Sequence, residues 1–201
     1  YGCYSLEELV LPETLTTLGE SSFDGCDGIV TLSLPGSIKT IPGNAFAYLV
    51  YLEELTINEG TTDIDEMAFN NCESLMKLNL PSTLESVGYA AFAYNMLTAI
   101  NINAATPPAC DATAFASWES NIPEGCKLYV PEGTKGAYSE ADVWKDFIIE
   151  ETTATGINGA HADEATETAR YDISGQKLLR PASGINIIRM SDGTTRKVLV
   201  H

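Results

Sequence analysis

Apolar residues return along the chain in a short pattern that is repeated about every 23 residues. Each copy has apolar side chains at the first, fourth and sixth of six positions, and the second half alternates between apolar and mostly polar residues. The copies start at Leu6, Ile29, Leu52, Leu75 and Leu97. Alternation with a period of two predicts a short β-strand with one buried and one exposed face. The chain is therefore expected to repeat a unit that contains one strand.

A phenylalanine marks the same place in every unit. The five residues are each 23 positions from the next, and Ala precedes all but the first: Phe23, Phe46, Phe69, Phe92 and Phe115. A period held without drift is typical of a solenoid, in which each repeat forms one coil and stacks on its neighbours. We expect these side chains to form a buried ladder inside the coils, with a helical or 3₁₀ turn at each Ala-Phe pair.

A second apolar pair follows each strand. Its members are three residues apart: Leu15/Leu18, Ile38/Ile41, Thr61/Ile64 and Leu84/Val87. Proline ends the strand in three copies, because it cannot donate a ladder hydrogen bond. The pair suits either a tight turn or a short second strand on another side of the coil.

The strand pattern L-x-x-L-x-L is the signature of leucine-rich repeats. Residues 33–46, SLPGSIKTIPGNAF, closely resemble the BspA-like, Treponema-type repeats, which use Ala-Phe instead of an Asn ladder. The resemblance covers residues 1–149. It implies an α/β solenoid, a right-handed superhelix of 23-residue coils with a parallel β ladder. It also implies export to the bacterial cell surface and, in some members, binding of host extracellular proteins.

The repeat pattern changes after the fifth copy, which begins one residue early. Residues 126–134 keep the order of strand then proline, and residues 135–147 have apolar side chains at helical spacing. We expect a helical C-terminal cap within residues 104–149. The sequence WKDF at residues 144–147 resembles the terminal segment of the same family.

The cysteines form two groups. Cys3, Cys26 and Cys72 share the 23-residue lattice and are interpreted as small buried side chains, although a Cys3–Cys26 bridge is geometrically allowed. Cys110 and Cys126 lie off the lattice on either side of the last Phe. They are compatible with a disulfide or with two free thiols, and the resembling family segment often has cysteines at both places.

The C-terminal part has a different composition. Residues 150–168 are rich in Thr, Ala, Gly and acidic residues and are expected to be a linker. Residues 169–201 contain alternating runs separated by turn signals such as Asp192-Gly193, which predicts a small antiparallel β module of four strands. Residues 171–177, 184–189 and 197–201 resemble the C-terminal sorting-type domain of secreted Bacteroidetes proteins. That resemblance implies export across the outer membrane and surface attachment.

The charge restricts the partners. Eleven Lys and Arg residues against 28 Asp and Glu give a formal charge of −17, which repels nucleic acid and anionic membranes. No apolar run has the length of about 18 residues that a spanning helix needs. No signal peptide is visible, and because the chain begins within a repeat we expect any export signal to lie upstream.

The repeats contain no motif of a reaction centre. No P-loop, dinucleotide-binding loop, Cys-x-x-Cys or nucleophile elbow is present. His161 and His201 have no fixed partner in the sequence. Asp63, Asp65 and Glu66 are compatible with a weak Ca²⁺ site but lack a dedicated calcium loop, so a solvated turn is favoured. We expect no enzymatic activity, no metal and no cofactor.

The solvent side of the strand ladder is the candidate binding surface. By period two it carries Glu8, Val10, Thr31, Ser33, Glu54, Thr56, Lys77, Asn79, Ala99 and Asn101. Tyr48 and Tyr94 share one repeat position and are either binding anchors or packing residues. The expected function is a monomeric secreted or cell-surface protein that binds an extracellular protein or glycan non-covalently, including host adhesion. The alternative is a structural spacer with no ligand of its own.

Overall fold

The computed structural model describes residues 2–3, 6–117 and 120–152, together with four strands between residues 167 and 200. The chain divides into two compact units, Tyr1–Gly156 and Ile157–His201.

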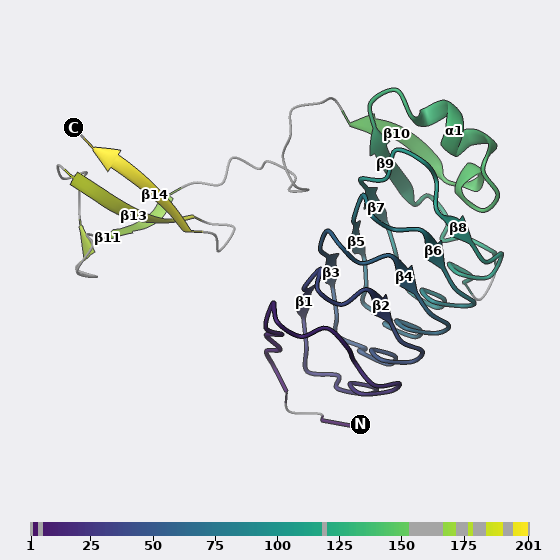
Figure 1. The fold of residues 1–201 in the computed structure, drawn as a ribbon, viewed down its shortest axis with the longest axis horizontal. Helices are drawn as coiled ribbons and strands as arrows, with labels where there is room; N and C mark the ends of the chain where they lie inside the picture. The colour runs from purple at the N-terminus through teal and green to yellow at the C-terminus, as the bar shows by residue number, and fades with distance from the viewer. Residues whose placement is uncertain are drawn as a thin grey trace. The chain divides into compact units, whose positions relative to one another are not determined.

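The first unit is a solenoid whose main sheet takes one strand from each successive coil (Figure 1). The strands, in their order across the sheet, are β1 (Thr31–Leu34), β3 (Glu54–Ile57), β5 (Lys77–Leu80), β7 (Ala99–Ile102), β9 (Lys127–Pro131) and β10 (Ile148–Thr152). All neighbours pair in parallel, with Leu32 beside Leu55 and Leu55 beside Leu78. Inward residues are buried and outward residues are exposed or half-buried. The period-two prediction and the parallel β-solenoid of 23-residue coils are therefore confirmed.

A second parallel sheet lies on another side of the coils (Figure 1). Its two-residue strands are β2 (Thr40–Ile41), β4 (Asp63–Ile64), β6 (Ser86–Val87) and β8 (Ala109–Cys110). Ile41, Ile64 and Val87 point inward and are buried. Of the two alternatives for the second apolar pair, the short strand is the one that forms in the second to fourth copies, whereas residues 15–18 of the first copy form no strand.

The phenylalanines form the expected ladder. Consecutive rings stack with centroids 5.3–5.4 Å apart and planes within 8° of parallel. Four of the rings are fully buried, and Phe23 is partly buried because only Phe46 stacks on it among the described residues.

The Ala-Phe segments are hydrogen-bonded turns that do not continue into a helix. Their backbone bonds join residues three positions apart, as from the Ala45 amide to the Pro42 carbonyl, so the predicted turn is of the 3₁₀ type and not α-helical. Residues two positions before and after Phe take positive φ: Ser21, Asn44, Met67, Ala90, Tyr48, Asn71 and Tyr94. These left-handed residues interrupt a helical path, and the freed amides turn toward the next coil. The Phe46 amide, for example, donates to the Ala68 carbonyl at 2.9 Å. The third side of each coil is thus held by a backbone ladder between coils.

Residues 6–11 carry the first copy of the strand pattern but form no strand. Leu6, Leu9 and Leu11 are partly buried against the core. Among the described residues, no backbone hydrogen bond joins this segment to β1, which is an edge strand of the main sheet. The predicted strand at this position is wrong because the pattern alone does not supply the ladder that stabilises a short strand.

The C-terminal end of the solenoid contains α1 (Lys135–Glu140) and a 3₁₀ helix, η1 (Trp144–Asp146). The single helix predicted over residues 135–147 is wrong in extent, because Val143 takes a φ of 69° and separates the two pieces. Tyr138 and Trp144 are fully buried and donate hydrogen bonds to the carbonyls of Ala104 and Pro108, both at 2.8 Å. Trp144 and Phe147 meet the Phe115 ring edge-on at 5.5 and 5.4 Å and cover the last ring of the ladder.

The second unit contains an antiparallel sheet in the order β12-β11-β13-β14. Its strands are β11 (Glu167–Tyr171), β12 (Lys177–Leu178), β13 (Gly184–Met190) and β14 (Thr195–Val200). The first residues of the predicted linker, up to Thr152, belong to β10. The rest of that linker up to residue 166, the Asp192-Gly193 turn and both histidines lie outside the described residues.

Candidate functional site

The outward side of the main sheet carries two columns of side chains, which we call the strand face. The register places Thr31, Glu54, Lys77, Ala99, Lys127 and Ile148 in one column and Ser33, Thr56, Asn79, Asn101, Tyr129 and Glu150 in the other. All predicted face residues from Thr31 to Asn101 lie in these columns. Glu8 and Val10 do not, because residues 6–11 are outside the sheet.

Hydrogen bonds between coils connect the polar column. The Asn101 Nδ2 donates to Asn79 Oδ1 at 2.8 Å, and the Asn79 Nδ2 donates to Thr56 Oγ1 at 3.0 Å and to Glu54 Oε1 at 3.3 Å. Asn58 Nδ2 donates to Ser33 Oγ at 3.3 Å. These bonds fix side-chain rotamers before any partner arrives, which lowers the entropy lost on binding.

The strand face carries both signs of charge. Lys127 Nζ and Glu150 Oε1 are 2.9 Å apart, on side chains that are 47% and 44% exposed. The hydrogen bond with Glu150 and its charge raise the pKa of Lys127. A pair this exposed stabilises a fold by less than about 1 kcal/mol, so its main effect is on the charge presented to a partner.

Sequence reasoning missed the part of the strand face that lies on β9 and β10. Lys127, Tyr129, Ile148 and Glu150 continue the two columns, and the Ile148 side chain is 51% exposed. The strand-then-proline order of residues 126–131 was the signal that could have extended the face to β9. The sequence has no comparable signal for β10.

The two tyrosines that share a repeat position have different environments. Tyr48 is 51% exposed, whereas Tyr94 is half-buried. Tyr48 therefore has the exposure of a binding anchor, while Tyr94 has more of the character of a packing residue.

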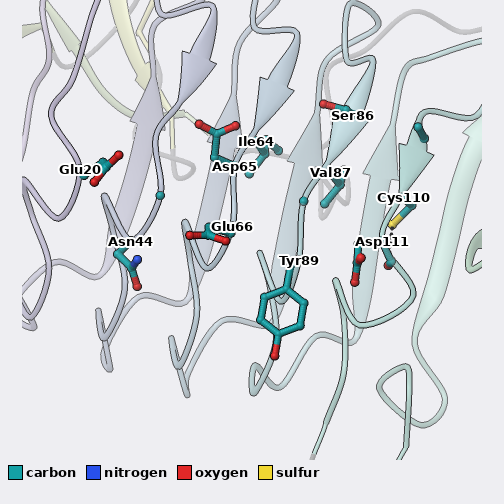
Figure 2. A pocket seen from close by; sticks show the side chains of 13 residues that line it. Glu20, Asn44, Ile64, Asp65, Glu66, Ser86, Val87, Tyr89, Cys110 and Asp111 are labelled. Carbon is teal, nitrogen blue, oxygen red and sulfur yellow. Dashed lines mark hydrogen bonds between the residues drawn. The ribbon is translucent and has the colours of Figure 1, made fainter.

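An acidic groove of about 640 Å³ crosses the coils where β4, β6 and β8 lead into the Phe turns (Figure 2). Its lining residues include Glu20, Gly43, Glu66 and Tyr89, which are 23 positions apart, and Asp65, Gly88 and Asp111, which share a second such column. Figure 2 shows Glu20, Glu66, Tyr89 and Asp111 in a row from coil to coil. Gly43 and Gly88 let neighbouring coils approach closely here, because a Cβ on either residue would lie 3.0–3.3 Å from backbone atoms of the adjacent coil. The column spacing of these residues could have revealed the groove from the sequence.

Two carboxylates of the acidic groove have pKa values shifted in opposite directions. Partial burial, followed by the charges of Asp63, Glu66 and Glu20, raises the pKa of Asp65. Hydrogen bonds from the Thr113 hydroxyl and amide, at 2.6 and 2.9 Å, lower the pKa of Asp111.

In the turn with Asp63, Asp65 and Glu66, where the sequence favours a solvated turn over a weak Ca²⁺ site, the Asp63 carboxylate accepts hydrogen bonds from the hydroxyls of Thr62 and Ser86. Within the described residues, no group of His, Cys, Asp and Glu side chains is arranged to hold a metal ion.

The cysteines are free thiols in the structure, so of the two alternatives for Cys110 and Cys126 the structure has the free thiols. Burial raises the pKa of Cys110 and of Cys126 to about 12, and Asp111 contributes to the shift of Cys110. Burial raises the pKa of the fully buried Cys72 thiol to about 12 as well. The raised pKa values favour the protonated thiols at neutral pH, which lowers the reactivity of these cysteines as nucleophiles.

The comparison with protein families matches residues 1–120 to the BspA type leucine-rich repeat region, in six copies. A search of curated proteins found no match. In the part of the chain that the structure describes, every helix is too short or too polar to cross a membrane. The family match extends over more than half of the 201 residues and coincides with the coils that carry the phenylalanine ladder. The chain belongs to the BspA-type leucine-rich repeat family.

Proposed function

We propose that this chain is a secreted or cell-surface binding protein that recognises an extracellular protein or glycan through the strand face. The observation that carries the proposal is the hydrogen-bonded column from Thr56 through Asn79 to Asn101. A parallel ladder holds these side chains in fixed rows, so they present one continuous polar surface to a partner.

Family membership supports protein binding in general, because leucine-rich repeats form interaction surfaces. Adhesion to a host surface is the more specific form of the proposal, and we propose no catalytic role. Tyr129 adds apolar contact area beside the amide of Asn101, and Ile148 adds more beside Lys127 in the other column. Such a combination of aromatic and hydrogen-bonding groups is typical of binding surfaces.

The second unit supports a surface location in this proposal. Residues 184–189 and 197–200, which belong to the part that resembles the sorting-type domain of secreted Bacteroidetes proteins, lie in β13 and β14. We propose that it serves export and attachment and that the protein acts as a monomer.

A structural spacer is the second candidate, and one observation favours it. The Asn79 Nδ2 group donates to both Thr56 and Glu54, so its two hydrogens are already used within the strand face. A surface that satisfies its own donors offers fewer of them to a ligand.

A binding assay of the full chain on immobilised extracellular-matrix proteins and on a glycan array separates the two candidates. Replacing Tyr129→Ala should weaken binding about tenfold or more, as expected for an anchor in a contact surface. The matched control is Tyr51→Ala, which removes an exposed tyrosine outside the strand face. Failure of the full chain to bind any of these surfaces, or equal losses in both variants, would contradict binding through the strand face.

A further inference from the structure

Cys3 and Cys26 occupy the same position in consecutive coils. The Leu6 amide donates to the Cys3 carbonyl at 3.1 Å, and the equivalent Leu75 amide donates to the Cys72 carbonyl at 2.8 Å. Cys3 therefore begins the same turn that Cys72 begins two coils beyond Cys26. The 23-residue spacing and the backbone hydrogen bonds thus both assign Cys3 and Cys26 to the same position of the coil.

The backbone ladder of the Phe turns also reaches this first coil. The Gly2 amide donates to the Asp24 carbonyl at 2.8 Å, as the Gly25 amide donates to the Ala47 carbonyl at 2.9 Å one coil later. This repeated bond sets Cys3 in register beside Cys26.

Adjacent coils have the separation that a disulfide needs. The Phe23 and Phe46 rings, one coil apart, have centroids 5.3 Å apart. In-register neighbours in such a stack have Cα atoms about 5 Å apart, within the range of about 4.4–6.8 Å for disulfides.

Cys3 also affects the protonation of the Cys26 side chain. Burial raises the pKa of the Cys26 thiol, and a hydrogen bond with the Cys3 side chain and its charge raise it further, against an opposing backbone hydrogen bond from Cys3. Cys3 is exposed, whereas Cys26 is only 1% exposed. An accessible thiol therefore lies against a shielded one.

We propose that Cys3 and Cys26 form a disulfide between coils when the protein meets a small-molecule disulfide such as oxidised glutathione. The bond closes a loop that contains residues 6–11, the segment without a strand, and holds it against the solenoid. Occurrence of the bond in the cell rests on the export proposed above, since disulfides persist in oxidising compartments. The reaction of the purified chain does not depend on it.

The reaction proceeds by two thiol–disulfide exchanges. The exposed Cys3 thiolate attacks one sulfur of oxidised glutathione, the sulfur–sulfur bond of glutathione breaks, and one glutathione thiolate leaves. The Cys26 thiolate then attacks the Cys3 sulfur of the mixed disulfide and expels the second glutathione thiolate. Two protein thiols are oxidised, one oxidised glutathione is reduced to two glutathiones, and the departing thiolates take up the thiol protons.

The test begins with the fully reduced chain in mixtures of reduced and oxidised glutathione, followed by alkylation, digestion and mass spectrometry. The expected product joins the Cys3 and Cys26 peptides and lacks two hydrogens relative to their sum. The Cys3→Ser variant should lose this product, and Cys110→Ser, which changes a half-buried cysteine outside this pair, should retain it. Recovery of Cys3 as an unmodified thiol, as a stable glutathione adduct or paired with a different cysteine would overturn the proposal.

Limited proteolysis tests the consequence for residues 6–11. A protease that cuts after Glu should cleave at Glu7 and Glu8 several-fold more slowly in the oxidised chain than in the reduced chain. In Cys3→Ser the two conditions should give equal rates. Equal rates in the unsubstituted chain would show that the bond does not hold this segment, and that part of the proposal would fall.

Discussion

Replacing Phe69→Ala removes the central ring of the phenylalanine ladder. The Phe69 side chain is fully buried, and Phe46 and Phe92 stack on its two faces at 5.3 Å. Truncation of a buried Phe costs about 3–5 kcal/mol, and each aromatic stack contributes about 0.5–1.5 kcal/mol beyond area burial. Backbone ladders on both sides keep the coils apart, so the cavity cannot collapse. We therefore expect a loss near the upper end, about 5 kcal/mol in the free energy of unfolding.

Phe23→Ala is the matched comparison within the same ladder. Phe23 is only partly buried, and Phe46 is its one stacked neighbour among the described residues. With less area buried and one stack lost, the expected cost is about 2 kcal/mol. Phe69→Leu keeps most of the volume and loses the stacking, so about 1–2 kcal/mol is expected.

Urea unfolding followed by circular dichroism, at fixed pH and salt, measures these differences. The slope of the transition must be compared as well, because a lower slope would mean that a repeat array unfolds in parts. Hydrogen exchange of the Phe-turn amides then gives the stability of each coil. Equal costs for Phe69→Ala and Phe23→Ala, or a cost below about 2 kcal/mol for Phe69→Ala, would refute the argument that the stacked rings support the array.

Three further changes test other parts of the solenoid by the same unfolding assay. Gly36→Ala would place a Cβ 1.7 Å from the Glu59 carbonyl oxygen. The backbone must move to relieve this clash, so a loss of about 3 kcal/mol in the free energy of unfolding is expected. Gly136→Ala is the control, because its Cβ would have no atom within 4 Å, and it should be neutral or stabilising. Thr61→Val removes a buried hydroxyl that donates to a backbone carbonyl at 2.7 Å, and a loss of about 1–2 kcal/mol is expected, with no loss contradicting that role. The pKa of Asp65 is raised above its ordinary 3.8 in the folded state, so the folded state binds this proton more tightly than the unfolded state. As pH rises from below 3.8 through the raised pKa, Asp65 therefore makes the protein progressively less stable. Asp65→Asn should therefore raise the melting temperature at pH 7 and lose this advantage near pH 3, and a decrease at pH 7 would contradict the sign.

The stacked columns could be predicted from the sequence because one physical cause sets them. A side chain that must pack on its equivalent in the next coil recurs every 23 residues, as Phe46, Phe69 and Phe92 do. The strand face followed in the same way from the period-two pattern. Even the acidic groove has a column signal, since Glu66 and Tyr89 are one repeat apart.

Local pattern failed where contacts between coils override it. Met67 and Ala90 take positive φ although neither residue type prefers that region, because the turn they form directs amides to the next coil. Residues 6–11 have the strand pattern of the other copies and still form no strand. Hydrogen bonds to a neighbouring strand, and not the sequence pattern alone, decide whether a short strand forms. The short extent of α1 likewise depends on how Trp144 fits over Phe115, a tertiary contact that helical spacing does not encode.

The missing ladder at residues 6–11 has a mechanical consequence. Hydrogen bonds between coils run along the stacking direction, so a force that pulls the ends of the solenoid apart loads the coil junctions one after another. Among the described residues, the junction at this segment lacks the strand pairing that the later junctions of the main sheet have, so it should open first. Each later coil of 23 residues should then release about 80 Å of extended chain in its own step. Under load, this protein is expected to lengthen in stages and keep the remaining coils folded.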